Sequence, residues 1–197
     1  MRRLARSAAL LALALASTAC ADLATSPTAA VPSRPSLEVL SSPVIANGVL
    51  RNIALIGDVS YSFDAGASIT TTVVVPNTGL KITVPSGALP KGVKTMRITV
   101  TARVGDMVAY DFEPHGTKFA KPLTLTQDVR GTNYGSLANP SAVEGGYFAD
   151  NSYLDELLNT ARVSEFLPVR VDATGTAVSM SVSHFSGYML SSGRRDD

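Results

Sequence analysis

Few side chains in this sequence could do chemistry, and the most suggestive pair lies near the C-terminus. The chain has two histidines, His115 and His184, and a single cysteine, Cys20. His184 comes shortly before Ser186, and a histidine base beside a serine hydroxyl can turn that hydroxyl into a nucleophile. The sequence contains no Gly-x-Ser-x-Gly elbow, phosphate-binding loop or dinucleotide fingerprint. It therefore offers one nucleophilic candidate and no complete catalytic motif.

The period of a strand predicts the surroundings of this pair. We expect Thr176–Leu190 to form the last long strand, in which alternate residues share a face. His184 and Ser186 would then point inward beside each other, unless Gly187 bulges the strand. A buried histidine beside a hydroxyl must be hydrogen-bonded, or it lowers the stability of the fold. Packing is the favoured interpretation of these residues, and catalysis by them is the alternative.

A second group of residues could in principle hold a metal. Asp111, Glu113 and His115 follow one another closely, but as ligands they would have to reach across a tight turn. A solvated turn histidine is the favoured interpretation of His115. We therefore predict no metal and no cofactor for this chain.

Composition limits the partners. Basic and acidic residues number 17 and 16, and three of the basic ones, Arg2, Arg3 and Arg6, belong to the N-terminal leader described below. This balance excludes the basic patch that nucleic-acid binding requires. A surface cluster of tyrosines could bind a glycan, although tyrosines in a sandwich are more often core or rim residues. The tyrosines in question are Tyr110, Tyr134, Tyr147 and Tyr153.

The elements that must position these residues are short strands. Leu80, Ile82 and Val84 alternate with polar residues, and Met96, Ile98 and Val100 do so again. Proline and glycine end each run, as in the segment 85–92 between these two strands. Further strands are predicted at 59–63, 69–75, 108–112 and 123–127. Short strands that glycine and proline end so regularly predict an all-β fold, an antiparallel β-sandwich.

Two stretches carry a family resemblance. VPSGALPKGVKTMRITV (84–100) and AYDFEPHGTKFAKPLTLTQ (109–127) resemble the ZU-five domain of netrin receptors, ankyrins and zonula occludens scaffolds, which is also found in bacterial secreted proteins. The resemblance implies a β-sandwich that binds partners, here over residues 48–191. The His184-Phe185-Ser186 triplet is also similar to the self-cleavage site of some animal relatives. That similarity implies Ser186 as nucleophile, His184 as base and Phe185–Ser186 as the scissile bond.

The N-terminal residues are typical of a signal for export and lipid anchoring. A basic start followed by the apolar run Ser7–Ala19 is typical of a signal peptide, assigned to residues 1–19. Cys20 stands where a bacterial lipoprotein carries its lipid, and plain secretion is the alternative. Residues 20–47 then form a proline-rich flexible tether. Ala21, directly after the cysteine, favours anchoring of the lipoprotein in the outer membrane if the host has two membranes.

After Gln127 the pattern loosens. Tyr153–Val163 has the apolar spacing of one short helix, with an irregular loop as the alternative. Glu165–Asp172 alternates as a strand, and Pro168 suggests that it lies at a sheet edge. Residues 192–197 form a polar tail. Taken together, these features predict a surface-tethered bacterial lipoprotein, a non-enzymatic interaction module that binds an envelope or surface protein or a glycan. The alternative is a domain that cleaves itself between Phe185 and Ser186.

Overall fold

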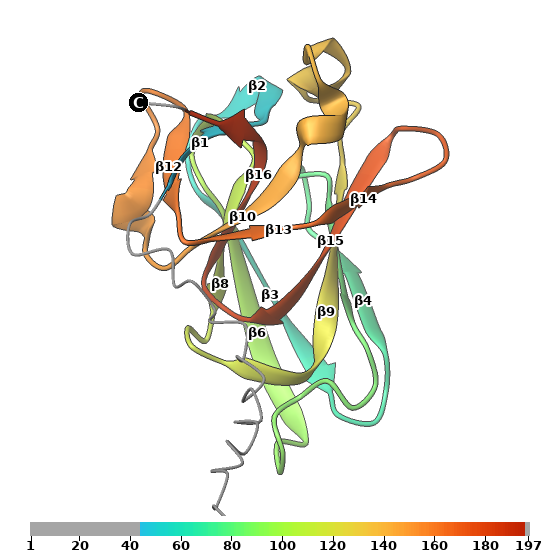
Figure 1. Ribbon diagram of the computed structural model, residues 1–197. Coiled ribbons are helices and arrows are strands. Elements are labelled where there is room, and N and C mark those ends of the chain that lie inside the picture. The colour runs from blue at the N-terminus through green and yellow to red at the C-terminus, as the bar shows by residue number, and fades with distance from the viewer. Residues whose placement is uncertain (1–43, 196–197) are drawn as a thin grey trace, which may run out of the picture. The chain divides into compact units, whose positions relative to one another are not determined.

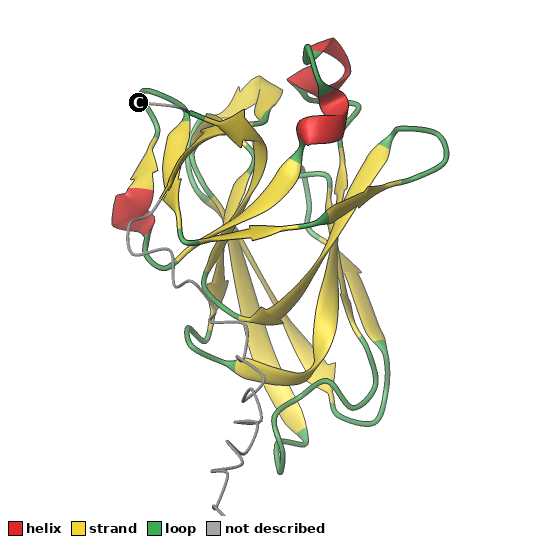
Figure 2. Ribbon diagram, in the orientation of Figure 1, coloured by secondary structure: helices red, strands yellow, loops and turns green. Residues whose placement is uncertain are grey.

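A computed structural model describes residues 44–195. They form an all-β structure with antiparallel pairing throughout and only three short 3-10 helices (Figure 2). The predicted all-β antiparallel sandwich is confirmed. The 3-10 helices are η1 (Asn133–Ser136), η2 (Pro140–Ala142) and η3 (Asn151–Tyr153).

Two sheets make up most of the structure (Figure 1). The larger has nine strands in the path β11-β12-β1-β16-β8-β6-β3, with β10 paired to β16 and β13 paired to β10. Its strands are β1 (Val44–Gly48), β3 (Val59–Gly66), β6 (Thr95–Ala102), β8 (Ala109–Glu113), β10 (Glu144–Phe148), β11 (Leu154–Asp155), β12 (Thr160–Val163), β13 (Glu165–Leu167) and β16 (Gly187–Arg194).

The smaller sheet has five strands in the order β14-β15-β9-β5-β4. They are β4 (Thr71–Val74), β5 (Leu80–Val84), β9 (Lys118–Asp128), β14 (Val169–Val171) and β15 (Ala177–His184). A separate two-stranded ribbon pairs β2 (Leu50–Leu55) with β7 (Gly105–Met107).

The core lies between the two main sheets because each contributes the apolar face that its sequence alternation predicts. Ile82 and Leu125 from the smaller sheet and Val100 and Phe112 from the larger belong to one buried cluster. A second, smaller cluster around Phe148 and Met189 covers part of the other face of the larger sheet. The strands predicted at 59–63, 80–84, 96–100 and 123–127 lie within β3, β5, β6 and β9.

Two runs predicted as single strands are each divided between the sheets. Glu165–Asp172 becomes β13 in the larger sheet and β14 in the smaller, with Pro168 between them. The run Thr176–Leu190 becomes β15 in the smaller sheet and β16 in the larger, and Phe185 and Ser186 form the crossing (Figure 1). The prediction of one continuous last strand is wrong, because the alternation of apolar residues does not indicate which of the two sheets a residue joins.

The predicted helix at Tyr153–Val163 is also wrong. The segment holds the end of η3 and the small hairpin of β11 and β12. Its tip is a turn in which the Asp155 carboxylate accepts the backbone N–H groups of Leu157 and Leu158. Asn159, at the end of this turn, has a left-handed φ of 52°. Leu157 is 95% exposed, so the apolar spacing that suggested a helix does not mark a buried face.

The ordered strands extend beyond the expected domain limits of 48–191. β1 begins at Val44 and β16 continues to Arg194, and the two strands pair. Residues 44–47 and 192–194 therefore belong to the larger sheet rather than to the tether and the tail. The signal peptide (1–19), Cys20 and most of the tether lie outside the described residues. Between residues 44 and 195, no helix is long and apolar enough to cross a membrane.

Candidate functional site

Phe185 fills the core at the crossing between the sheets. Its ring is 1% exposed and lies 4.6 Å, centroid to centroid, from Phe119 and 5.2 Å from Phe112. Gly187 follows because no side chain fits there: a Cβ would lie 1.8 Å from Cε2 of the buried Phe148. The crossing is therefore held by close aromatic packing on both sides.

The backbone of the crossing is hydrogen-bonded to the loop after β8 and to β8 itself. Phe185 N–H donates to the Thr117 carbonyl at 2.9 Å, and the Phe185 carbonyl accepts the Gly116 N–H at 3.0 Å. The Ser186 carbonyl accepts the Phe112 N–H at 3.1 Å. The Ser186 hydroxyl, in a residue only 5% exposed, donates to the Ala149 carbonyl at 3.0 Å. These bonds fix the Phe185–Ser186 peptide and its serine hydroxyl in place.

His184 contacts other groups. Its Nε2 lies 3.6 Å from a carboxylate oxygen of Glu165, and its ring meets the Tyr147 ring edge-on at 4.6 Å between centroids. The Tyr188 hydroxyl lies 3.2 Å from His184 Nδ1 and donates to the His184 carbonyl at 2.5 Å. Burial raises the pKa of Tyr188, and the nearby Tyr147 and Glu165 raise it further, so this hydroxyl stays protonated as a donor.

The structure thus places the three predicted residues at one crossing but does not join His184 to Ser186 by a hydrogen bond within residues 44–195. The cause is the change of sheet: β15 ends at His184 and β16 starts at Gly187, so the alternation expected to align the two side chains is interrupted. The Ser186 hydroxyl is held by the Ala149 carbonyl, and a proton transfer from it to His184 would require that hydrogen bond to break.

The other sequence candidates are separated or buried. His115 pairs with Asp111, with Nε2 3.1 Å from a carboxylate oxygen, and Asn151 donates to the same carboxylate at 3.2 Å. No group of three or more metal-ligating residues occurs in the described part of the chain. Tyr110 and Tyr134 are 1% and 8% exposed. The four tyrosines therefore do not form a surface cluster, and at these two positions the core interpretation holds.

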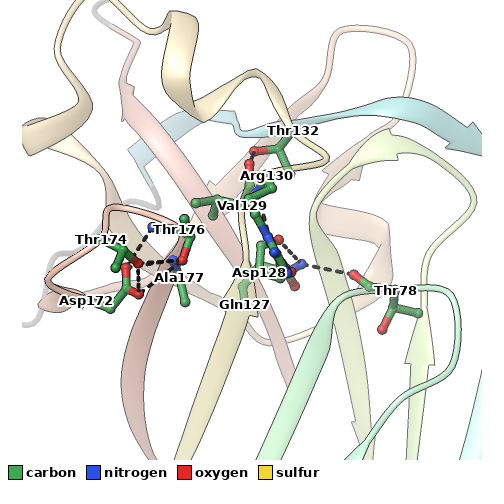
Figure 3. A network of polar contacts seen from close by, with 10 residues as sticks. All are labelled: Thr78, Gln127, Asp128, Val129, Arg130, Thr132, Asp172, Thr174, Thr176 and Ala177. Atoms are coloured by element: carbon green, nitrogen blue, oxygen red, sulfur yellow. Dashed lines mark hydrogen bonds and ion pairs between the residues drawn. The ribbon is translucent and has the colours of Figure 1, made fainter.

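A polar network that the sequence did not reveal lies at the end of β9 (Figure 3). Gln127, which is 3% exposed, donates through Nε2 to the carbonyls of Thr78 and Asp128 at 2.9 Å each. Its Oε1 accepts the Tyr110 hydroxyl at 2.6 Å. Burial raises the pKa of Tyr110, although the neighbouring Arg51 opposes the effect. Gly79, with φ of 73°, gives Gln127 room, since a Cβ there would lie 2.7 Å from Nε2.

Three charged residues, Asp128, Arg130 and Asp172, form the rim of this network, and each of them is bonded to a neighbour. Arg130 forms a two-point ion pair with Asp128, and this pairing lowers the pKa of Asp128. Across the rim, Asp172 accepts hydrogen bonds within its own turn (Figure 3). In the sequence, the only signal for the network was a glutamine at an inward position of a strand.

Comparisons with known proteins do not assign this chain to a family. No protein-family model matches it, and no curated protein sequence is similar to it. The functional interpretation therefore depends on the residues and their geometry.

Proposed function

We propose that this protein is a surface-tethered bacterial lipoprotein whose β-sandwich is a non-enzymatic interaction module of the cell envelope. The signal-like residues 1–19 and Cys20 after small residues support export and lipid anchoring. The ZU-five resemblance of residues 84–100 and 109–127 supports a partner-binding role. The partner is an envelope or surface protein, or a glycan.

The observation that carries the interaction role is the pair of open edges of the five-stranded sheet. β14 and β4 are its terminal strands, and each exposes an apolar side chain: Val171 is 44% exposed and Val74 is 63% exposed. An unpaired edge can accept a strand from another chain, which gives backbone hydrogen bonds and pockets for alternate side chains. Pro168 precedes β14 and leaves the edge only three residues long, which limits unwanted pairing.

Matched substitutions at the two edges test this role. Val171→Lys on β14 should abolish crosslinking of the full chain to its envelope partner, because a charge on a short edge opposes strand addition. Val74→Lys on β4 makes the same change at the other edge, and the edge whose substitution abolishes crosslinking is the one that the partner joins. Equal crosslinking by both variants and the unmodified chain would exclude both edges as the binding surface. For the anchor, intact mass of membrane-extracted protein should show a lipid that Cys20→Ser removes.

Self-cleavage between Phe185 and Ser186 is the second candidate. It is favoured by one observation: the Phe185 carbonyl already accepts the Gly116 N–H at 3.0 Å, and such a donor would stabilise the oxyanion formed when Ser186 attacks. The serine hydroxyl would add to that carbonyl, the C–N bond would break to leave an ester, and water would hydrolyse the ester. Denaturing mass spectrometry should then find residues 186–197 as a separate fragment that Ser186→Ala abolishes. A single intact mass in both proteins would contradict cleavage.

A further inference from the structure

Arg51, near the start of β2, is a buried cation that no carboxylate in the described part of the chain pairs with. It is 9% exposed, its Nη1 donates to the Met107 carbonyl, and its Cζ lies 5.5 Å from the centre of the Tyr110 ring. It takes part in no ion pair with any residue between 44 and 195. Burying a charge in this way lowers stability unless an opposite charge compensates it. The fold thus keeps a positive charge that the described residues leave unbalanced.

The unused donors of Arg51 lie on one edge of its guanidinium group. Nε and Nη2 are both buried and have no hydrogen-bond partner in the described part of the chain. In a planar guanidinium these two N–H groups point in the same direction, with a spacing that fits the two oxygens of a carboxylate. Arg51 therefore retains the edge that recognises a planar oxyanion through two parallel hydrogen bonds.

This arginine lines a cleft of about 420 Å³, within the range of small-molecule sites, about 300–1,000 Å³. Its walls come from β2, the turn at 77–79 and the segment 127–132. Backbone pairing holds these walls together. The Asn52 N–H donates to the Gly131 carbonyl at 2.9 Å, and the backbones of Arg51 and Thr132 form an isolated antiparallel β-bridge. Figure 3 shows Thr78, Gln127 and Thr132, three of the residues that line the cleft.

The charge and chemistry of the lining define the ligand. Arg130 also lines the cleft, but Asp128 balances its charge, so Arg51 alone contributes an uncompensated charge. A monoanionic carboxylate matches this charge better than a phosphate dianion. The neutral side chains of Asn52, Asn77 and Thr132 also line the cleft, and amides and hydroxyls both donate to and accept from sugar-like hydroxyl groups.

We propose that this cleft binds a small hydroxylated carboxylic acid, such as a sugar acid, through the Nε and Nη2 edge of Arg51. The site is distinct from the crossing at Phe185–Ser186 and from the β14 edge, and it does not depend on lipid anchoring. Arg51 has the makings of a specific site because it belongs to the lining of a polar cleft, and because its charge and two of its N–H donors have no partner among the described residues.

Titration of the purified full chain with galacturonate, followed by calorimetry and by amide NMR shifts, tests this proposal. Saturable binding is expected, with shifts at Thr78, Gln127 and Thr132. The variant Arg51→Met should weaken binding at least about tenfold, since hydrogen bonds to a charged group are lost. The control Arg97→Met should bind as well as the unmodified chain, because the Arg97 side chain is 67% exposed and lies outside the lining of the cleft.

Neutral galactose and inorganic phosphate separate the chemistry of the ligand. Both should bind at least about tenfold more weakly than galacturonate, the first for lack of a charge and the second for its shape and excess charge. Absence of galacturonate binding, equal binding by Arg51→Met, or preference for phosphate would overturn the proposal. Amide shifts of the unmodified chain confined to residues far from the cleft would overturn it as well, whatever the fold of the variants.

Discussion

The crossing at Phe185–Ser186 and the cleft at Arg51 are opposite in how they use polar groups. At the crossing, both backbone carbonyls, the Phe185 N–H and the Ser186 hydroxyl are all bonded within the fold, and aromatic rings fill the remaining space. At the cleft, a buried guanidinium keeps two donors without partners in the described part of the chain. Residue types that suggest chemistry can be fully engaged in packing, whereas unused hydrogen-bonding capacity indicates a binding site.

The largest effect that tests this difference is expected at the crossing. Phe185→Ala should lower the free energy of unfolding by about 3–5 kcal/mol, because it removes a fully buried ring and leaves a cavity between the sheets. Urea unfolding followed by circular dichroism measures the change. Phe166→Ala is the control. The Phe166 ring is partly exposed and packs against Arg194, so its removal should lower the free energy of unfolding clearly less. Equal losses would show that the crossing is not a point of dense packing.

At the cleft, a substitution is expected to change the free energy of unfolding in the opposite direction. Arg51→Met should raise the free energy of unfolding by about 1 kcal/mol in ligand-free protein, because a flexible apolar side chain replaces an unbalanced buried charge. The same unfolding measurement applies. Arg97→Met is the control: its side chain is 67% exposed, so its replacement should change stability by less than about 0.5 kcal/mol. A marked loss of stability in Arg51→Met would instead make Arg51 a structural residue.

The sequence predicted one part of the fold much better than the other. Between Val59 and Asp128 each main-sheet strand stays within one sheet, so strict alternation and terminal glycines or prolines were enough to locate β3, β5, β6 and β9. After Gly131 the chain changes sheets at Pro168 and again at Phe185–Ser186. Alternation continues through both crossings, and it therefore suggested single strands and a pairing of His184 with Ser186 that the fold does not form.

The cleft was invisible in the sequence for a different reason. Arg51 lies in the run VLRNIALI (49–56), whose apolar residues indicate a first strand or the junction between a strand and the tether. Its burial depends on segments far away in the chain, at 77–79 and 127–132, and no local pattern encodes that contact. A charged residue inside an otherwise apolar strand, together with the inward-facing Gln127 far along the chain, is the signal from which a polar cleft could be predicted.

The smallest expected effect concerns Asp172, in the turn between β14 and β15. Its carboxylate is hydrogen-bonded within the fold, like the polar groups of the crossing and unlike the two Arg51 donors that have no partner in the described part of the chain. Its carboxylate accepts the Thr174 hydroxyl and the backbone N–H groups of Thr176 and Ala177, and these bonds, that of Thr174 first, lower its pKa from 3.8 to about 2. A lowered pKa in the folded state means that the ionised group stabilises the fold above pH ~4, and that this contribution is lost as the pH falls toward ~2.

Asp172→Asn should therefore be slightly less stable than the unmodified chain at neutral pH, and the difference should vanish near pH 2. NMR titration of the Asp172 carboxyl carbon provides the direct measurement, and Thr174→Val should move its midpoint up toward the ordinary value, because the strongest donor is removed. A midpoint near 3.8 in the unmodified chain, unchanged by Thr174→Val, would mean that this turn leaves its carboxylate as uncommitted as the guanidinium of Arg51. The contrast between engaged and unused polar groups would then fail at the rim, where Thr176 and Ala177 of this turn line one hollow together with Asp128 and Arg130.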